Sequence, residues 1–282
     1  MKKIDLHTHT TASDGMLSPS ALVDRAVAEG VSALVIADHD TTGGIEEAVN
    51  HAENLDIDVI PGIEFSIDYE DGTFHLLGLM IDWNNEELNT RVKRLVELRA
   101  TRAERIVEDL NDKGYIISYD EVLQEADGAA IGKPHVARVL VRHGYAPSFQ
   151  DVFKKFLEPG MPGHAPKEKI YFEESLELIK KAGGIPVLAH PASLNFESFD
   201  EFEAALKGYI DAGLEGIEAY AEMHTPDDAK VYAALAKKYN LIVTGGSDFH
   251  GDKEEELGFY QPGEPIPESC YTSLIACHEA RT

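Results

Sequence analysis

The sequence predicts an α/β protein with a mainly parallel sheet or barrel, and three observations support this prediction. Short apolar runs recur along the chain and alternate with amphipathic helical segments. Several of these runs have a His, Asp or Glu at one end. A long helical stretch interrupts the alternation, which divides the chain into an α/β domain (1–84 and 166–282) and a helical insertion (85–165).

The first predicted strand ends on His7-Thr8-His9. Side chains alternate along a strand, so Asp5, His7 and His9 share one face and the two imidazoles are neighbours. Considered by itself, this pair is explained equally well by two surface histidines that have no functional role. If the strand begins an α/β barrel, its carboxyl end lies at the functional end of the barrel, and the polar turn containing Asp14 follows it.

The next three strands also carry a ligand-type side chain near one end. A helix capped by Ser18-Pro19 and ended by Gly30 precedes the all-apolar run 33–37, which leads into His39. After a second helix through about Asn54, the run 57–65 ends with Glu64, and the run 74–79 has His75 near its start.

The insertion contains no convincing strand, and its apolar spacing predicts helices at 86–111, 119–126, 134–143 and 148–157. Because no flexible linker flanks it, we expect it to pack over the mouth of the α/β domain. The alternation then resumes with helices at 172–182, 199–212 and 227–239. The intervening strands are 185–189, 216–220 and 241–247, and the first and last lead into His190 and Asp248-Phe249-His250.

The composition limits the classes of function. With 51 acidic and 25 basic residues, the formal net charge is −26, which disfavours long nucleic acids and anionic membranes as partners. The two cysteines exclude a disulfide framework. The N-terminus lacks the apolar region of a signal peptide, and no run approaches the roughly 20 apolar residues of a membrane span, so we expect a cytoplasmic protein.

Collecting the ligand-type residues at the strand ends gives more ligands than one metal ion accepts. One ion takes three or four protein ligands, so six imidazoles and three carboxylates predict two or three ions sharing at least one carboxylate. Mixed ligation of this kind suits Mn²⁺, Fe or Zn²⁺ and does not single out one of them. Mn²⁺ is the expected ion, with Fe and Zn²⁺ as alternatives. The nine residues are His7, His9, Asp14, His39, Glu64, His75, His190, Asp248 and His250.

Five ordered motifs resemble those of the PHP (polymerase and histidinol phosphatase) family. They are His7-Thr8-His9 with Asp14-Gly15, Ile36-Ala37-Asp38-His39-Asp40, Pro61-Gly62-Ile63-Glu64, Leu188-Ala189-His190-Pro191 and Gly246-Ser247-Asp248-Phe249-His250. They are most similar to the motifs of small phosphoesterases, among them nucleoside 3′,5′-bisphosphate phosphatases and 5′-to-3′ exoribonucleases. The resemblance covers essentially the whole chain and implies a distorted, TIM-like (β/α)₇ barrel with a trinuclear metal centre.

The resemblance also implies how the ligands divide among the ions. His7, His9, Glu64 and Asp248 would hold the first ion, and Glu64 would bridge to a second held with His75 and His190. Asp14, His39 and His250 would hold a third. Many relatives have His at the position of Asp14, which makes the third ion the least certain. We expect Glu64, Asp248 and His190 to be the catalytic residues.

Basic residues of the insertion are candidates for binding a substrate phosphate. Lys133, His135 and Arg138 lie at the start of a predicted helix, whose dipole favours an anion, and similar segments of the family contact a phosphate. Lys167, in the loop after the insertion, is a second candidate. A solvated helix face is the alternative for the first three residues.

Other polar residues near the strand ends are expected to play supporting roles. Metal-bound imidazoles usually donate their second N–H to a carboxylate, so Asp38 and Asp5 would orient ligands and Asp40 would cap a helix. Glu218 and His224 follow another strand, where contact with the site is one alternative and a capping or surface role is the preferred one.

These features predict a metal-dependent phosphoesterase acting on a small phosphorylated metabolite. Bound metal lowers the pKa of water to near 7, which supplies a nucleophile for a phosphate ester. The preferred substrate is a nucleoside 3′,5′-bisphosphate, hydrolysed to the 5′-monophosphate. The alternatives are a cyclic sugar phosphate, histidinol phosphate, exonucleolytic trimming of short RNA, and a non-catalytic metal- or nucleotide-binding module. The sequence does not indicate the oligomeric state.

Overall fold

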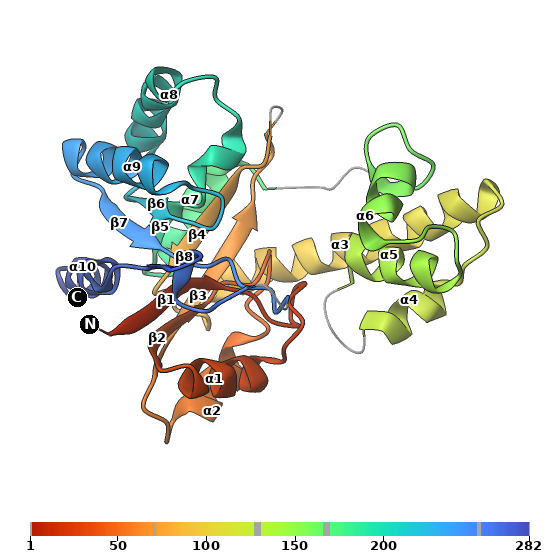
Figure 1. The fold of residues 1–282 in the computed structure, drawn as a ribbon, viewed down its shortest axis with the longest axis horizontal. Coiled ribbons are helices and arrows are strands. Elements are labelled where there is room, and N and C mark those ends of the chain that lie inside the picture. Colours follow the sequence, from red (N-terminus) through yellow and green to blue (C-terminus); the bar gives the residue numbers. More distant parts are fainter. Residues whose placement is uncertain (1, 70–71, 127–130, 166–169, 253–254, 282) are drawn as a thin grey trace. The chain divides into compact units, whose positions relative to one another are not determined.

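The computed structural model describes residues 2–69, 72–126, 131–165, 170–252 and 255–281 (Figure 1). The chain forms two compact units, one made of residues 1–92 and 169–282 and the other of residues 93–168. The larger unit contains the sheet and the smaller unit is helical.

One sheet of seven strands organises the larger unit, and its strands are neighbours in chain order. They are β1 (Lys3–Thr8), β2 (Val31–Ile36), β3 (Asp58–Ser66), β4 (His75–Leu79), β5 (Ile185–Leu188), β6 (Gly216–Tyr220) and β7 (Ile242–Gly245). The sheet curls so that the segment after β7 lies beside β1. Thr8 forms a parallel bridge with Phe249, and the carbonyl of Phe249 accepts the N–H of His9 at 2.9 Å. This curled, parallel-rich half-barrel confirms the predicted α/β, TIM-like fold.

The strand β4 departs from the parallel arrangement. It is antiparallel to both β3 and β5, and His75 pairs with Ser66. The connection from Ser66 to His75 is too short for the crossover that parallel neighbours need, so the chain turns back on itself. Because β4 is reversed, its first residue lies at the edge where the parallel strands end, and His75 therefore lies at the same edge as Glu64.

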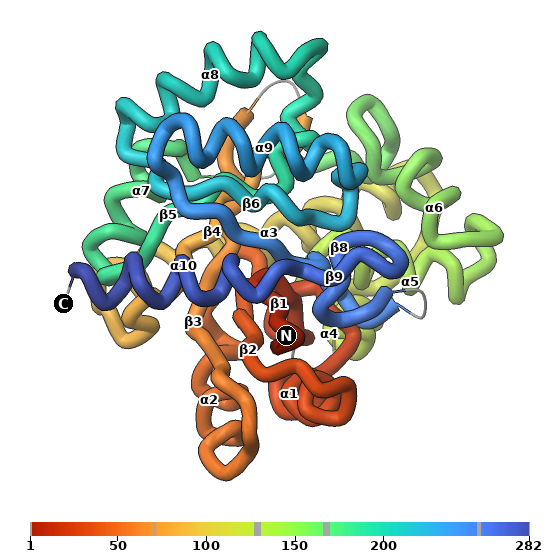
Figure 2. The backbone as a smooth tube through the Cα atoms, turned by 60° about the vertical axis from the view of Figure 1, so that its left-hand side comes forward, coloured from red at the N-terminus to blue at the C-terminus, as the bar shows by residue number. Residues whose placement is uncertain are grey.

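Helices cover the sheet on both sides (Figures 1 and 2). α1 (Pro19–Ala28) begins at the predicted Ser18 cap and packs beside α2 (Ile45–Ala52). On the other side lie α7 (Phe172–Lys181), α8 (Phe199–Ala212) and α9 (Pro226–Lys238), with Tyr232 of α9 against Phe199 and Phe202 of α8. Most of these elements lie close to their predicted ranges.

The C-terminal elements were not predicted. A hairpin of β8 (Phe259–Gln261) and β9 (Glu264–Pro265) precedes α10 (Glu268–Glu279), which packs against β7 and β1 (Figure 2). α10 buries only Cys270 and Leu274, so its apolar stripe is too weak to read from the sequence. These two side chains pack into a core with Ile4 and Leu6 of β1, and both cysteines are free.

The helical unit has its own core. This unit contains most of α3 (Glu86–Asp112), together with α4 (Tyr119–Ala126), α5 (Lys133–Arg142), α6 (Phe149–Val152) and a π-helical turn (Phe153–Leu157). Ile106 and Leu110 of α3 pack with Val136, Leu140 and Phe156. The single helix predicted at 148–157 therefore corresponds to α6 and the π-helical turn. In the described part of the chain, no helix has the length and apolar character needed to cross a membrane.

Candidate metal centre

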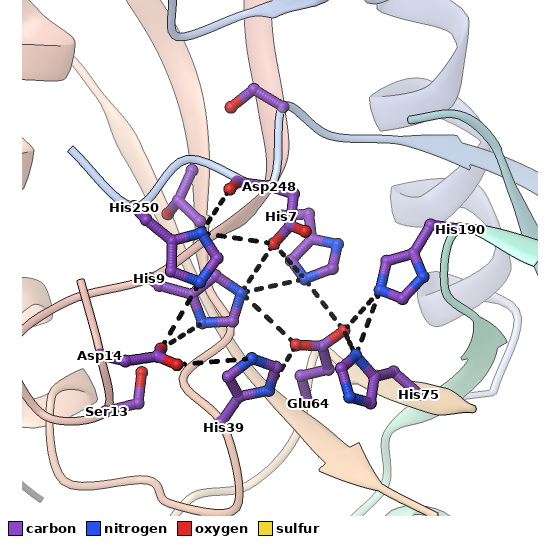
Figure 3. Close-up of polar contacts among 12 residues, drawn as sticks. His7, His9, Ser13, Asp14, His39, Glu64, His75, His190, Asp248 and His250 are labelled. Carbon is purple, nitrogen blue, oxygen red and sulfur yellow. Dashed lines mark hydrogen bonds and ion pairs between the residues drawn. The ribbon is translucent and has the colours of Figure 1, made fainter. Parts of the chain in front are cut away.

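The nine predicted ligand residues lie together at one edge of the sheet (Figure 3). Their side chains point toward one another, although they come from segments as far apart as β1 and the loop after β7. Glu64, His7 and His9 are fully buried, whereas the side chains of Asp14 and His250 are 27% and 29% exposed. The cluster is therefore buried around Glu64, His7 and His9 and reaches solvent at Asp14 and His250.

The carboxylate of Glu64 is the centre of the cluster. Its Oε1 lies within 3.0–3.3 Å of three imidazole nitrogens, those of His7 (Nε2), His75 (Nδ1) and His190 (Nε2). Its Oε2 lies 2.7 Å from Nδ1 of His39 and 3.4 Å from Nε2 of His9. A carboxylate with both oxygens surrounded by imidazoles is suited to bridging two cations.

Potential ligand atoms form three overlapping groups, and within each group they lie within 4.8 Å of one another. The groups are His7, His9, Glu64 and Asp248; His39, Glu64 and His75; and His9, Asp14, His39 and His250. His190 adjoins the second group, because its Nε2 lies 3.2 Å from Nδ1 of His75. The first group has the same members as the set implied for the first ion. Asp14 lies in the third group, with its Oδ1 3.5 Å from Nε2 of His250.

The donor set fits divalent cations. Nδ1 of His9 and Oδ1 of Asp14 are buried and accept or donate no hydrogen bond, although each faces other ligand-type atoms. Buried polar atoms without partners are costly unless an unseen group satisfies them. Imidazole and carboxylate ligands together favour Mn²⁺, Fe or Zn²⁺ over Ca²⁺ or Mg²⁺.

Glu218 contributes to this cluster, and the predicted capping or surface role for it is wrong. Its side chain is buried in β6, where Oε1 accepts a hydrogen bond from Nδ1 of His7 at 3.0 Å and Oε2 accepts the backbone N–H of His190 at 2.8 Å. One signal in the sequence could have revealed this: a lone carboxylate between Ile217 and Ala219, within an apolar strand, is expected to have a buried partner.

His224 also lies in the interior rather than on the surface. Its Nδ1 donates to the carbonyl of Ala219 at 2.9 Å, and its Nε2 accepts the N–H of Ala192 at 3.3 Å. Both ring nitrogens have backbone partners, so His224 is a structural histidine that supports the segment after His190.

Two buried aspartates hold the turns that carry predicted ligands. Asp5 accepts hydrogen bonds from the backbone N–H and hydroxyl of Ser247, at 3.0 and 2.6 Å, and thereby fixes the turn that carries Asp248. Asp38 accepts from Ser13 at 2.6 Å and from the N–H of Thr10 at 2.7 Å, beside Asp14. Both aspartates thus orient backbone turns instead of imidazole rings.

The predicted helix cap at Asp40 is wrong. Its carboxylate accepts the N–H of Ser66 at 2.9 Å, and the N-cap of α2 is Gly44, which has no side chain to offer. Asp40 therefore joins the end of β2 to the end of β3, close to Glu64.

The environment of the cluster shifts the pKa values of its histidines in opposite directions. Burial alone would lower the pKa of His250, but the nearby carboxylates of Asp14 and Asp248 raise it to about 10. Burial of His7 is likewise outweighed by Glu218, Glu64 and Asp248, so its pKa is raised. Burial and the charges of the neighbouring imidazoles His250 and His39 lower the pKa of His9 to about 3.

Metal binding is expected to release protons at pH 7.5. In the metal-free protein a pKa of about 10 keeps His250 protonated at this pH, and the pKa of His7 is shifted in the same direction. A cation must displace such protons to reach the ring nitrogens. The apparent affinity should therefore rise with pH, up to about tenfold per pH unit for each proton released. Titration calorimetry with Mn²⁺ in two buffers of different ionisation enthalpy measures the number of protons.

A matched pair of variants locates the source of these protons. His250→Asn should reduce the number released, whereas His143→Gln, at an exposed ion pair with Glu121, should leave it unchanged. Binding that releases no proton at pH 7.5 would contradict the assigned protonation states.

Three of the predicted phosphate-binding residues, Lys133, His135 and Arg138, lie within α5. Nζ of Lys133 donates to the carbonyl of Leu157 at 2.6 Å, and Nδ1 of His135 accepts the N–H of Gly132 at 3.1 Å, which caps the helix. Arg138 is partly exposed on the same helix. Lys167 lies outside the described residues.

The sequence prediction did not include Arg102, which belongs to the same basic cluster. Its Nε donates to the carbonyl of Ala165 at 2.8 Å, and its charge, after burial, lowers the pKa of Lys133 to about 8. In the described part of the chain, no carboxylate lies within ion-pair distance of Arg102 or Lys133. Spacing along α3 could not reveal this pairing, because it depends on how α3 packs against α5.

Comparison with known families defines the class of this protein. The model of the PHP domain matches residues 5–211, so the chain belongs to the PHP domain family. Together with the site, this membership makes it a metal-dependent hydrolase of the phosphoesterase class.

Individual relatives cover nearly the whole chain. It is 33% identical to the 3′,5′-nucleoside bisphosphate phosphatase of Chromobacterium violaceum, over 98% of both chains. It is 36% identical to the 5′-3′ exoribonuclease Rnm of Escherichia coli, over 87% of this chain and 84% of the relative. A solved structure from Bifidobacterium adolescentis, provisionally described as a metal-dependent phosphoesterase, is 30% identical with a TM-score of 0.84, covering 98% of this chain and 96% of the other.

Proposed function

We propose that the protein removes the 3′-phosphate from a nucleoside 3′,5′-bisphosphate, giving the 5′-monophosphate and inorganic phosphate. The observation that carries the proposal is the match to the bisphosphate phosphatase of Chromobacterium violaceum, which spans 98% of both chains. The reaction adds water across the phosphoester: a new P–O bond forms from water, the bond to the ribose oxygen breaks, and that oxygen takes a proton.

The catalytic work is assigned to the cluster around Glu64. Bound divalent ions would lower the pKa of water and neutralise the phosphoryl oxygens. Glu64 and Asp248 would hold these ions in a fixed array, since their carboxylates face the same imidazoles. His190, which is buried beside Glu64, would complete the second ion position. We propose two or three ions, with Mn²⁺ as the metal, and a cytoplasmic setting.

Basic residues of the helical unit are proposed to bind the second phosphate of the substrate. Lys133 and Arg102 place two cations near each other; the charge of Glu158 also acts on Lys133, but no described ion pair joins Glu158 and Lys133. In a protein of net charge −26, a local group of cations of this kind favours a multiply charged anion. Arg138 and Lys167 stay in this set as proposed substrate residues, and His135 joins them at the start of α5.

The decisive experiment is a phosphate-release screen with Mn²⁺. The substrates are nucleoside 3′,5′-bisphosphates, cyclic sugar phosphates, histidinol phosphate and short RNA, each assayed before and after metal removal by a chelator. We expect the bisphosphates to have the highest kcat/KM. If the purified protein holds less than one ion per chain and added Mn²⁺ supports release from none of the phosphoesters, the enzymatic proposal is wrong.

Trimming of short RNA is the second candidate, because the similarity to the exoribonuclease Rnm is as high as that to the phosphatase. The net charge of −26 disfavours long polymers but leaves short oligonucleotides open. Products from a labelled RNA pentamer distinguish the two: release of 5′-mononucleotides from the 5′ end supports the exonuclease, and an intact pentamer supports the phosphatase.

Replacing Arg138 by alanine is expected to raise KM for a nucleoside 3′,5′-bisphosphate about tenfold, with a smaller effect for a nucleoside 3′-monophosphate. The loss of one charge-assisted hydrogen bond, about 1.5 kcal/mol, accounts for that factor. Arg142→Ala, four residues on along the same helix and paired with Glu125, is the matched control and should change neither KM. Equal effects of Arg138→Ala on both substrates would remove this helix from the proposed substrate site.

A further inference from the structure

Glu218 contacts two predicted ligands that belong to different ion positions. One carboxylate oxygen accepts a hydrogen bond from the ring of His7, which lies in the first ligand group, at 3.0 Å. The other oxygen accepts the backbone N–H of His190, which adjoins the second group, at 2.8 Å. The two imidazole rings stack nearly parallel, with an angle of 14° and centroids 5.9 Å apart. A single buried side chain therefore supports both positions.

The contact with His7 determines which of its ring nitrogens can bind a metal. A carboxylate accepts only, so Nδ1 of His7 carries the hydrogen in the bond to Glu218. This leaves Nε2, which faces Glu64 at 3.3 Å and Asp248 at 3.4 Å, as the nitrogen whose lone pair a cation can use. Without Glu218 the ring could rotate or adopt the other tautomer, and the ligand atom would no longer be defined.

The contact with His190 holds an unfavourable backbone conformation. His190 has φ +22° and ψ +64° and precedes a proline, a combination that a residue with a β-carbon rarely adopts. Glu218 accepts the N–H of this residue, and the 3₁₀ turn Pro191–Leu194 follows directly. The strained backbone directs the ring of His190 toward Glu64, so losing this acceptor would displace a ligand of the second position.

Ser193 provides a comparison, because it acts on only one of the two ligands. Its hydroxyl donates to the carbonyl of Thr73 at 2.6 Å and therefore accepts the hydrogen on Nδ1 of His190, at 2.9 Å. Nε2 of His190 is left to face Glu64 at 3.1 Å. Ser193 thus sets the tautomer of His190 and has no contact with His7 among the described interactions.

We propose that Glu218 is a positioning residue that couples the first and second metal positions, by fixing the tautomer of His7 and the backbone of His190 through one carboxylate. The proposal rests on the proposed metal centre but not on the proposed substrate. It predicts that a change at Glu218 weakens two ions together, whereas a change at Ser193 weakens one.

The test is a titration of the metal-free Glu218→Gln variant with Mn²⁺. The electron paramagnetic resonance signal of the free ion gives the concentration of unbound Mn²⁺ at each step. Glutamine keeps the size of the side chain but has one acceptor oxygen, so it can serve His7 or His190 but not both. Losing a group that orients a ligand typically lowers metal affinity 10- to 100-fold. We therefore expect two ions to bind about 10- to 100-fold more weakly, and only one ion to do so in Ser193→Ala.

A thermal measurement separates positioning from a merely structural role. In Glu218→Gln the Tm of the metal-free protein should fall, because buried groups lose a charged partner, and the metal-dependent increase in Tm should shrink as well; a merely structural role would lower only the first. Glu177→Gln, at an exposed carboxylate on α7 that pairs with Lys181, is the control and should leave both values unchanged. If Glu218→Gln does not fold, Glu218→Asp, which keeps the charge but withdraws the carboxylate, is used in the same titration with the same expectation.

Two results would overturn the proposal. One is that the folded variant at position 218 binds every ion with the affinity of the wild-type protein. The other is weakening of a single ion, which would assign Glu218 to one position only. Neither depends on hydrolysis of a substrate, and a wild-type protein that binds no Mn²⁺ would instead contradict the proposed metal centre.

Discussion

Asp248→Asn is expected to lower kcat by more than about 100-fold with little change in stability. Oδ1 of Asp248 lies 2.9 Å from Nε2 of His9 and 3.4 Å from Nε2 of His7, so the carboxylate is one of the few groups that would bind the first ion directly. Removing a residue that only orients a ligand already costs 10- to 100-fold, and removing a direct ligand should cost more. Asn preserves the shape and also tolerates the positive φ of +55° found here.

The measurement compares kcat with the midpoint of urea unfolding for the same variant. Asp228→Asn, in the capping box of α9 with Thr225, is the counterpart: it should reduce stability by about 1 kcal/mol or less and leave kcat unchanged. Parallel losses of activity and stability in Asp248→Asn would point to a structural role for this aspartate.

Glu64→Gln is expected to have the second large effect. The variant should lose at least two bound ions, and because the ions are lost it should also lose its activity. The carboxylate of Glu64 faces five imidazoles, and the charges of His75, His39 and His7, despite the opposing effect of burial, hold its pKa well below the usual range. A neutral amide can neither bridge two cations nor balance those imidazoles. Metal analysis of the purified variant by mass spectrometry gives the number of ions directly.

Glu46→Gln, an exposed carboxylate in the first turn of α2, serves as the control and should retain the full metal content. If Glu64→Gln kept as many ions as the wild-type protein, the carboxylate would not be a bridge, and His75 and His190 would have to hold the second ion without it.

The sequence predicted most of the fold because its signals are local. Ser18-Pro19 marks the start of α1, and the all-apolar run before His39 marks a strand buried on both faces. The predicted ligand residues could also be recognised, since each lies near an end of a strand or in the segment after it, and strands of one sheet meet at shared edges. Their gathering around Glu64 follows from that rule together with the reversal of β4.

The missed features depend on contacts between distant segments. The apolar strand around Glu218 indicates a buried partner, but its identity follows only when β6 is placed next to both β5 and β7, which brings Glu218 to His190 and His7. Arg102 and Lys133 lie far apart in the sequence and approach one another only in the packed helical unit. α10 was missed because its burial depends on β1 and β7 rather than on a strong apolar stripe of its own.

The reversed strand β4 makes the metal content sensitive to the length of one hairpin loop. His75 is the first residue of β4 and pairs with Ser66, so the turn that joins β3 to β4 determines the face to which its ring points. Adding or deleting one residue in that turn would shift the strand by one position and turn His75 away from Glu64. For the other predicted ligands, which lie near or after the carboxyl ends of parallel strands, a length change in the preceding loop need not have this result. Natural variation in loop length is therefore expected to be restricted before β4 and more freely tolerated elsewhere around the sheet.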